Sequence, residues 1–424
     1  MTMRNCSIVK IRPICKITLA FASIVLTFAS ISKPTAVQFS QDLNSLVHLL
    51  DSVHPKPWRH QIKQQFRDRL TKNPGLLSTY PIGPWLTISR ALNGLDPKQQ
   101  DSVTGVNLLK QEHTWSLLPI TFGAFEEGIF VVGAEQQWNH LVGEKVNKIN
   151  GVDVSSLYRK VAGYFPSHES GWVLQYLRIT RLLRYLGAPC RSECSIELMK
   201  DSPGNTVKLN TSRDLIKDKS YQQDLDAVHI IRAYRNNQDK QDSLIQLGPE
   251  TIYWDLSDKA VSSTLKYNET EQYIIAYLRN QLINNIILDL RDIQLTDPTL
   301  IERLWALIRK IPDESAHRVI YVMIDGSTSR LVFNLISRLN DMPEVIFVGE
   351  STGLQLSHYH DPKTVTLNRT QLTLSIATRH LNLGQDNKPF MPAHRVTWRA
   401  YDYFQGSDTV LLAILDLIEI NSPD

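Results

Sequence analysis

Ser329 is the side chain in this sequence that is best placed to act as a nucleophile. It ends the run DGSTS, residues 325–329, which directly follows an apolar, β-branched segment and directly precedes a predicted helix. At such a point, the backbone N–H groups and the positive end of the helix dipole stabilise both an alkoxide and the oxyanion of a tetrahedral intermediate. Ser and Thr are also favoured helix caps, so capping is the structural alternative for these hydroxyl groups.

The segments around Ser329 predict an α/β fold. Residues 286–290, 319–324 and 345–348 are apolar runs of the kind found in buried strands, and residues 298–311 and 331–339 carry apolar side chains at helical spacing. Continuous apolar strands joined by helical crossovers predict a mainly parallel sheet that is covered on both faces. Ligands and catalytic groups collect beyond the carboxyl ends of such strands, so we expect the chemistry just after these three strands.

The N-terminal half of the sequence is organised differently. Apolar side chains recur at helical spacing between residues 42 and 99, which predicts a small helical domain. Within residues 128–210, a strand ending in Ile-Asn-Gly is followed by an apolar hook and a helix. This order resembles a PDZ domain, which binds an extended peptide by adding it to a sheet edge. The predicted boundaries are 1–36 for a signal peptide, 37–105 for the helical domain, 106–212 for the PDZ-like region and 213–424 for the α/β core.

Residues 1–36 have the pattern of a secretory signal peptide. A basic region with Arg4, Lys10, Arg12 and Lys16 precedes an apolar run, and small residues follow. The apolar run is shorter than the roughly 20 residues that a membrane-spanning helix needs, and an uncleaved signal anchor is the alternative. We therefore expect a secreted or periplasmic protein.

Composition and charge describe an ordinary globular chain. The 424 residues include 46 Lys+Arg and 43 Asp+Glu, for a formal net charge of +3, and 42% of them are hydrophobic. The predicted signal segment is basic and carries no acidic residue, so its removal leaves the mature chain close to neutral. A near-neutral chain without a clustered Lys/Arg face lacks the electrostatic footprint of nucleic-acid binding. We therefore expect no nucleic-acid partner.

Cys190 and Cys194 are the cysteines that remain after removal of the signal segment. In an oxidising compartment, two cysteines this close in sequence favour a local disulfide. A structural zinc site needs four nitrogen or sulfur ligands, and no second Cys/His pair has matching spacing. The motifs HExxH, GxxxxGK[ST], GxSxG and GxGxxG do not occur either. The sequence therefore predicts no metal site and no cofactor.

The order of these segments resembles the tail-specific, or C-terminal-processing, serine peptidase family, which includes relatives of the tricorn protease core. The resemblance covers nearly all of the mature chain. It implies a ClpP/crotonase-like α/β core with a PDZ-like unit and a helical N-terminal domain. The matching segments are HPKPW from His54, GEKVNKING from Gly143, IILDLR from Ile286, GSTS from Gly326, VGESTG from Val348 and GSDTVLLAIL from Gly406.

The resemblance implies Ser329 as the nucleophile, and it also shows where this chain departs from the family. Many members have a Lys general base after the VGEPT-like segment. Gln355 stands at that position here, and an amide does not accept a proton at neutral pH. The family's glycine-rich turn, which helps to form the oxyanion hole, is replaced by Asp-Ile-Gln-Leu at residues 292–295. These residues do not adopt positive φ as readily as glycine does.

A third landmark of the family is an Asp-x-His-Thr sequence, whose His is the base in the tricorn-like branch. Two segments compete for this position. Residues 101–104 read DSVT and lack the His, whereas residues 112–114 read EHT and keep it as His113. The distance to the following Leu-Pro pair favours the first segment. His113 is therefore either an alternative base or a surface histidine.

His358, His360 and Asp361 form a further polar cluster shortly after Gln355. Side chains alternate along a strand, so His358 and His360 would share one face. They offer a substitute base or a pair of metal ligands, and polar residues on an exposed strand face are the plainer alternative. Lys363 is a further alternative base if the loop is rebuilt.

Two hypotheses for the function follow. The first is a secreted or periplasmic serine-type peptidase that binds an extended peptide or protein C-terminus through the PDZ-like unit and presents it to Ser329. The second is a catalytically inactive relative, a pseudoenzyme, that binds peptides or scaffolds other proteins; the loss of the Lys and of the glycine turn favours it. In both cases we expect membrane contact only through an uncleaved signal segment. The sequence leaves the oligomeric state open.

Overall fold

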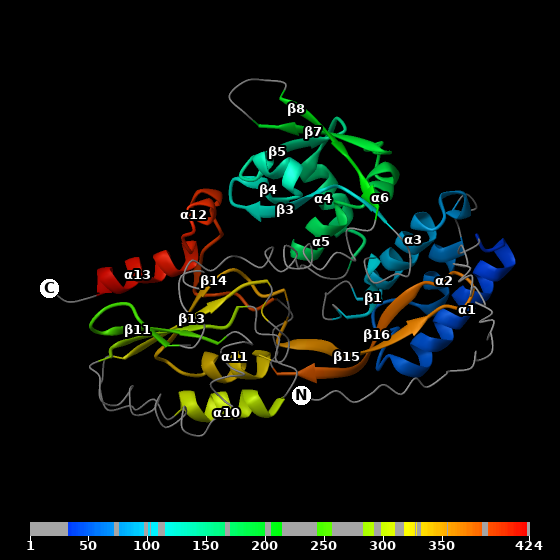
Figure 1. Ribbon diagram of the computed structural model, residues 1–424. Coiled ribbons are helices and arrows are strands. Elements are labelled where there is room, and N and C mark those ends of the chain that lie inside the picture. The colour runs from blue at the N-terminus through cyan, green and yellow to red at the C-terminus, as the bar shows by residue number, and fades with distance from the viewer. Residues whose placement is uncertain are drawn as a thin grey trace, which may run out of the picture. The chain divides into compact units, whose positions relative to one another are not determined.

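The computed structural model describes most of the chain from Lys33 onward, and residues 33–424 form one compact unit. Figure 1 shows the order of its helices and strands. Among the described residues, no helix combines the length and the apolar character that crossing a membrane requires. The described residues are 33–71, 76–96, 101, 103–108, 115–165, 170–199, 205–213, 244–256, 283–291, 298–309, 318–326, 328, 332–353, 355–383 and 389–421.

The described chain begins with helices, and a capping box fixes the start of the first, α1 (Ala36–Val53). The Thr35 side chain accepts a hydrogen bond from the Gln38 backbone N–H, and the Gln38 side chain accepts one from the Thr35 N–H. This reciprocal cap satisfies N–H groups at the helix start, so α1 begins before residue 42, where the predicted helical pattern starts. The helices that follow are α2 (Lys63–Thr71), η1 (Leu76–Thr79) and α3 (Ile82–Asn93).

A long hairpin from the C-terminal half packs against these helices. Its strands β15 (Ser357–Thr366) and β16 (Thr373–Asn382) pair antiparallel, and β1 (Gly105–Val106) pairs with β16. The Asp42 carboxylate in α1 accepts hydrogen bonds from the backbone N–H (2.6 Å) and the hydroxyl (2.8 Å) of Thr370 in the hairpin turn. Apolar spacing in the sequence predicts a shorter hairpin, with strands at residues 364–367 and 372–376, and the observed strands are longer because polar residues also pair across the ladder.

The middle of the described chain forms small sheets and short helices. The largest of these sheets has the order β6-β5-β7-β8, with antiparallel neighbours. The Asp153 carboxylate caps α4 by accepting a hydrogen bond from the Ser156 N–H. Cys190 and Cys194 form a disulfide, as predicted. The elements are β2 (Ser116–Leu117), β3 (Ile120–Phe125), β4 (Gly128–Ala134), η3 (Gln136–Leu141), β5 (Val146–Ile149), β6 (Val152–Asp153), α4 (Val154–Ala162), α5 (Ser170–Tyr176), α6 (Thr180–Tyr185), β7 (Glu193–Leu198), β8 (Thr206–Asn210) and β9 (Ser212–Arg213).

A six-stranded sheet dominates the C-terminal half. Its order is β10-β11-β12-β13-β14-β17; β10 pairs antiparallel with β11, and every later pair of neighbours is parallel. Strand β11 lies outside the alternation that the sequence predicts, although its sequence TIYWD is rich in the β-branched and aromatic side chains that favour strands. The elements are β10 (Leu244–Gln246), β11 (Thr251–Asp255), β12 (Asn285–Asp289), α10 (Pro298–Ile308), β13 (Val319–Ile324), α11 (Phe333–Asn340), β14 (Val345–Gly349), β17 (His394–Arg395), α12 (Ala400–Phe404) and α13 (Thr409–Asn421).

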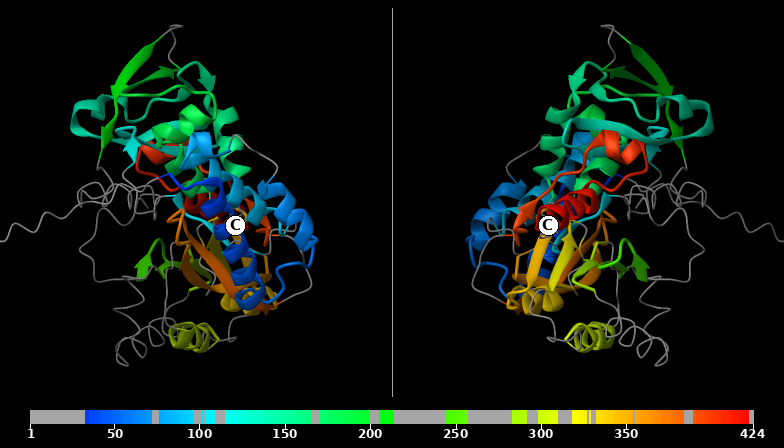
Figure 2. Two further views of the ribbon diagram at one scale, coloured as in Figure 1. Left: turned by 90° about the vertical axis from the view of Figure 1, so that its right-hand side faces the viewer. Right: turned by 90° about the vertical axis from the view of Figure 1, so that its left-hand side faces the viewer.

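Helices cover both faces of this sheet. Ile286 and Leu288 of β12 belong to one core with α10 and α11, whereas Ile287 between them belongs to a second core with α13. This division follows from the two-residue period of a strand. Figures 1 and 2 show α10 and α11 on one side of the sheet and α13 on the other. Because β12, β13 and β14 run parallel, their carboxyl ends meet at one edge of the sheet, where the candidate site lies.

Candidate active site

The turn after β13 leads to Ser329. The Asp325 backbone N–H donates to the Thr328 hydroxyl (3.0 Å), and the Thr328 N–H donates to the Asp325 carbonyl (3.1 Å). Both residues are buried. Ser329 itself lies outside the described residues, as do His113 and residues 292–295. By its sequence position, Ser329 belongs to the short connection between this turn and α11.

Gln355, at the position where the sequence resemblance implies a Lys, is packed into the interior. The residue is 2% exposed and forms an isolated antiparallel bridge with Pro389. The backbone carbonyl oxygen of Gln355 lies 2.8 Å from Nδ1 of His358. A carbonyl oxygen only accepts hydrogen bonds, so Nδ1 carries a proton, and when the ring is neutral Nε2 is its acceptor nitrogen. The structure therefore brings together two of the predicted site residues, Gln355 and His358.

His358 packs against the first turn of α11. The residue is 1% exposed, and its ring centroid lies 5.5 Å from that of Phe333, the first residue of the helix. The ring centroid of His360 lies 6.2 Å from that of His358, which agrees with the prediction that the two share a strand face. Among the described residues, His358 is thus an imidazole in contact with the helix that the Ser329 connection leads into.

The other predicted bases that the structure describes have more open surroundings. Lys363 is exposed on β15. Nδ1 of His360 lies 3.1 Å from a carboxylate oxygen of its neighbour Asp361, and both side chains are partly exposed. Within the described ranges, no group of three or more His, Cys, Asp or Glu residues is arranged to hold a metal ion. Neither Lys363 nor His360 has the burial of His358.

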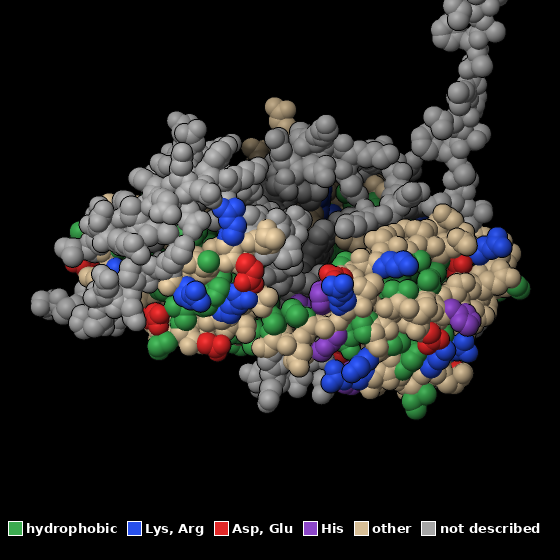
Figure 3. Space-filling model, turned by 90° about the horizontal axis from the view of Figure 1, so that it is seen from below, with side chains coloured by type: hydrophobic (Ala, Val, Ile, Leu, Met, Phe, Trp, Pro, Cys, Tyr) green, Lys and Arg blue, Asp and Glu red, His purple; other side chains and the backbone are tan. Residues whose placement is uncertain are grey.

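Histidine side chains also lie close to Lys and Arg side chains on the face shown in Figure 3. For His380 on β16, burial lowers the pKa, and the charges of Arg59 and Lys56 lower it further. Its Nε2 lies 3.3 Å from the Ser357 hydroxyl on the paired strand. A lowered pKa favours the neutral imidazole, so this contact joins a neutral ring to a hydroxyl. The sequence analysis did not identify it.

Two carboxyl groups follow neighbouring strands at the candidate site, Asp325 after β13 and Glu350 after β14. Burial raises the pKa of Glu350, and the charge of Asp325 raises it further. A hydrogen bond from the Trp398 backbone and the charges of Arg395 and Arg291 act in the opposite direction without cancelling the rise. Glu350 is not among the site residues predicted from the sequence, although an acidic side chain directly after a buried strand is a visible signal.

A buried ion network lies at the same edge of the sheet. Arg291 is 1% exposed and contacts Asp289 (Nη2 to Oδ2, 2.9 Å) and Asp408 (Nη2 to Oδ2, 2.5 Å). The Tyr253 hydroxyl donates to Asp289 (2.6 Å), and the Arg291 guanidinium lies 5.6 Å from the ring centroid of Trp398. Burial alone would lower the pKa of Arg291, but the two carboxylates raise it well above its ordinary value. The guanidinium therefore remains charged in the interior.

The DSVT segment that competes with EHT for the family's His position is buried. The Lys56 N–H donates to Nδ1 of His54 (3.1 Å), so Nε2 of His54 carries the proton that is donated to Asp101 (2.9 Å). Burial acts to raise the pKa of Asp101, but hydrogen bonds from His54 and Thr104 hold it below its usual value. Val103, at the position of the missing His, packs in an apolar cluster. EHT lies outside the described residues.

The layered sheet, the small sheets and the N-terminal helices together define a mixed α/β protein whose fold is similar to that of CPAF. Mature CPAF in complex with lactacystin has a TM-score of 0.59 and 14% identity to this chain, and the match covers 90% of this chain and 98% of that one. A serine-to-alanine variant of CPAF has a TM-score of 0.57 at 12% identity, with 92% and 99% covered.

A further similar structure is that of the photosystem II D1 C-terminal processing protease, with a TM-score of 0.38, 11% identity and coverage of 85% of this chain and 94% of that one. No model of a known protein family matches the sequence, and no curated protein matches it. At these identities, the likeness to CPAF is a likeness of fold.

Proposed function

We propose that this protein is a serine-type, peptidase-like hydrolase that acts on extended peptides or protein ends, with Ser329 as its nucleophile. The observation that carries the proposal is the shared fold with CPAF, which extends over nearly the full length of both chains. Solved CPAF structures include a complex with lactacystin and a variant in which a serine is replaced by alanine. The position of Ser329 between β13 and α11 supports the same role.

In this proposal, His358 is the general base. A serine nucleophile needs a base that a third group holds in orientation. The Gln355 carbonyl accepts the Nδ1 proton of His358, which fixes the tautomer that has its acceptor at Nε2. Gln355 then contributes through its main chain, because its amide side chain cannot replace the family's Lys. The contact between His358 and Phe333 supports a place for the base beside the Ser329 connection.

The finer architecture belongs to the same proposal. The sheet β6-β5-β7-β8 with α4 forms the PDZ-like unit of region 106–212, which binds peptide at a strand edge. It lies in sequence between a helical domain at 37–105 and a ClpP/crotonase-like core at 213–424. The parallel pairing of β11 to β14 supports the assignment of the core. The order of β5, the Ile-Asn-Gly turn, β6 and α4 supports that of the PDZ-like unit.

The proposed location is outside the cytoplasm, in the periplasm or in the secreted fraction, with residues 1–36 as a signal peptide. The disulfide between Cys190 and Cys194 supports this location, because structural disulfides persist in oxidising compartments. Fractionation of cells that express the full chain, with N-terminal sequencing of the mature protein, tests it. Recovery of an unprocessed chain in the cytoplasm would contradict it.

A fluorophosphonate probe and intact-mass analysis test the role of Ser329. We expect a stoichiometric adduct on the mature wild-type protein and on Ser45→Ala, a control that removes an exposed serine of α1. We expect no adduct on Ser329→Ala. Lactacystin is the second probe, because CPAF is known in complex with it.

Variants at two basic side chains test the assignment of the base. His358→Gln should lose labelling and peptide hydrolysis together, whereas Lys363→Gln, which changes an exposed cation on the same strand, should keep both. Circular dichroism melting shows whether each variant is folded. If the wild type takes up neither probe and cleaves no peptide but binds peptides in a pull-down, the inactive peptide-binding or scaffolding function replaces the enzyme proposal.

A further inference from the structure

A pocket of about 420 Å³ lies between α3, the end of α4 and the end of α6. It has no part in the proposed hydrolytic site, since none of its lining residues comes from the six-stranded sheet or from β15. The lining residues are Arg90, Arg159, Lys160, Gly163, Tyr164, Tyr185 and Leu186.

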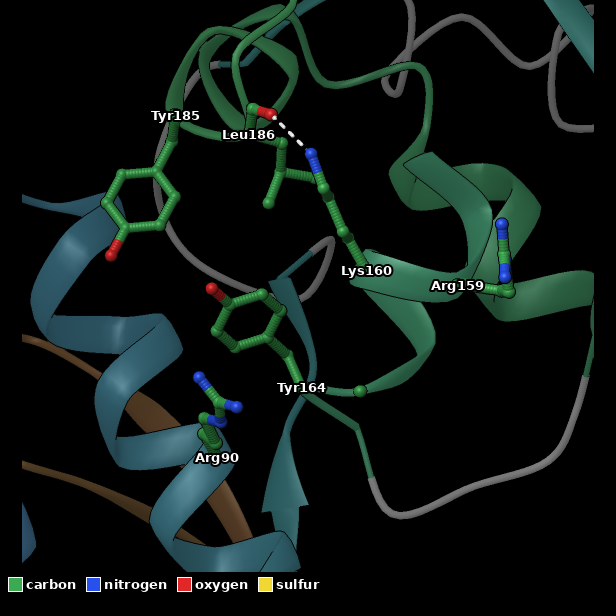
Figure 4. A pocket seen from close by; sticks show the side chains of 7 residues that line it. Arg90, Arg159, Lys160, Tyr164, Tyr185 and Leu186 are labelled. Carbon is green, nitrogen blue, oxygen red and sulfur yellow. Dashed lines mark hydrogen bonds between the residues drawn. The ribbon is translucent and has the colours of Figure 1, made fainter. Parts of the chain in front are cut away.

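The side chains around this pocket make it positively charged. Arg90 projects from α3 and Lys160 from α4, and both are exposed to solvent. Figure 4 shows Arg90 beside the Tyr164 ring, the Tyr164 and Tyr185 hydroxyls turned toward one another, and Arg159 further along α4. The Arg90 guanidinium carbon lies 5.7 Å from the Tyr164 ring centroid. None of the described residues that line the pocket is a carboxylate.

Hydrogen bonds fix the walls of the pocket. The Ser89 hydroxyl of α3 donates to the Tyr164 carbonyl (2.6 Å), and Nζ of Lys160 donates to the Leu186 carbonyl (3.3 Å). Arg184 of α6 donates from Nη2 to the Cys190 carbonyl (2.8 Å), which ties α6 to the disulfide loop. The segments that carry Arg90 and Lys160 are therefore held in place before a ligand binds, which lowers the entropic cost of binding.

The Tyr164 hydroxyl is kept as a hydrogen-bond donor. Burial raises its pKa, and the neighbouring Tyr185 raises it further, while Arg90 acts in the opposite direction without cancelling the rise. The phenol thus stays protonated at neutral pH. Lys160 uses one of its three N–H donors on Leu186 and retains the others. The pocket therefore presents a guanidinium, an ammonium and phenol hydroxyls as donors, together with two aromatic rings.

We propose that this pocket is a binding site for a small organic anion, with a phosphate or carboxylate group held by Arg90 and Lys160 and a carbon frame packed against Tyr164 and Tyr185. Planar guanidinium groups bind phosphate and carboxylate oxygens in pairs, and an ammonium adds a point charge. Aromatic walls take up the apolar part of such a ligand. Arg159 at the rim strengthens the attraction without contacting the anion.

Isothermal titration calorimetry on the mature protein at about 0.15 M ionic strength, where surface charges are screened beyond about 8 Å, tests this site. The probes are phenyl phosphate, benzoate, inorganic phosphate and, as the neutral comparison, benzyl alcohol. We expect one site for phenyl phosphate or benzoate and no binding of benzyl alcohol. The tighter of the two aromatic anions identifies phosphate or carboxylate as the preferred group, and weak binding of inorganic phosphate shows the contribution of the ring.

Three single variants locate the binding. Arg90→Gln and Lys160→Gln should each weaken the affinity about tenfold, the loss expected for one charge-assisted hydrogen bond. Lys208→Gln removes an exposed cation on β8 and should leave the affinity unchanged. The proposal is overturned if no anion binds the wild type, or if Lys208→Gln weakens binding as much as Arg90→Gln. Repeating the titration on Ser329→Ala separates this result from the proposed hydrolase function, because binding here does not depend on Ser329.

Discussion

Replacing Arg291 by Met should destabilise the protein strongly. The guanidinium makes four side-chain hydrogen bonds to carboxylates, two with Asp289 and two with Asp408. The carboxylates are 0% and 2% exposed. Methionine has a similar length and no charge, so the volume is largely kept while both carboxylates lose their counter-charge.

The expected loss follows from this burial. Removing one partner of a buried, hydrogen-bonded ion pair costs about 3 to 5 kcal/mol, because the remaining charge is left uncompensated. Here two carboxylates remain, and Asp408 also accepts N–H bonds from Val410 and Leu411 at the start of α13. We therefore expect the upper part of that range, which is a large share of the roughly 5 to 15 kcal/mol that stabilises a typical domain.

Urea denaturation followed by tryptophan fluorescence measures the change, with Arg338→Met as the matched control. Arg338 makes a two-bond ion pair with Glu302 at 2.8 Å, but the two side chains are 32% and 55% exposed. An exposed pair contributes about 0 to 1 kcal/mol. If Arg291→Met costs less than about 1 kcal/mol, or no more than Arg338→Met, the reasoning from burial is refuted.

Two further variants test single contacts. Burial holds the folded-state pKa of Glu350 above its ordinary value, so the ionised carboxylate destabilises the folded state once the pH rises through the folded-state pKa. Glu350→Gln should therefore raise the free energy of unfolding at pH 7. In urea melts this gain should shrink as the pH falls through the folded-state pKa, and it should be absent where the carboxyl group is protonated in both the folded and the unfolded state; a gain that does not vary with pH contradicts this. Asp42→Ala leaves the turn N–H of Thr370 without its acceptor, at a cost of about 1 to 3 kcal/mol. Hydrogen exchange at the Thr370 amide should accelerate in this variant. An unchanged exchange rate would show that the Asp42 carboxylate does not protect this N–H group.

Local sequence patterns predicted the elements whose burial is continuous. The strands β12, β13 and β14 are apolar runs because helices cover both faces of their sheet, and α10 and α11 carry the apolar stripes that pack on one of these faces. The start of α1 was missed because it depends on a polar cap at Thr35 rather than on apolar spacing. Strand β11 was missed because one short run, TIYWD, carries no period of its own, although the sheet makes it a neighbour of β12.

The candidate site was predictable only where its residues are close in sequence. Gln355 and His358 are three positions apart, and the sequence predicts both as candidate site residues. Arg291 and Asp408 are separated by 117 positions, and no periodicity links a residue after a strand to the cap of a distant helix. The Asp408 carboxylate both accepts N–H bonds at the start of α13 and neutralises Arg291. Pairings of this kind depend on topology, which local patterns do not report.

Gln355, in place of the Lys that the sequence resemblance implies, is compatible with a serine hydrolase that uses a histidine as its base. A Lys base is neutral at pH 7 only when burial or a neighbouring charge depresses its pKa strongly. A histidine is largely neutral there without such a shift, so a base taken from β15 removes that requirement. Val103, at the lost His position of the tricorn-like branch, packs with Tyr359, and neighbouring residues of a strand point to opposite faces. His358 therefore lies on the other face of β15, the one that contacts α11, and this contact supports its proposed role as the base.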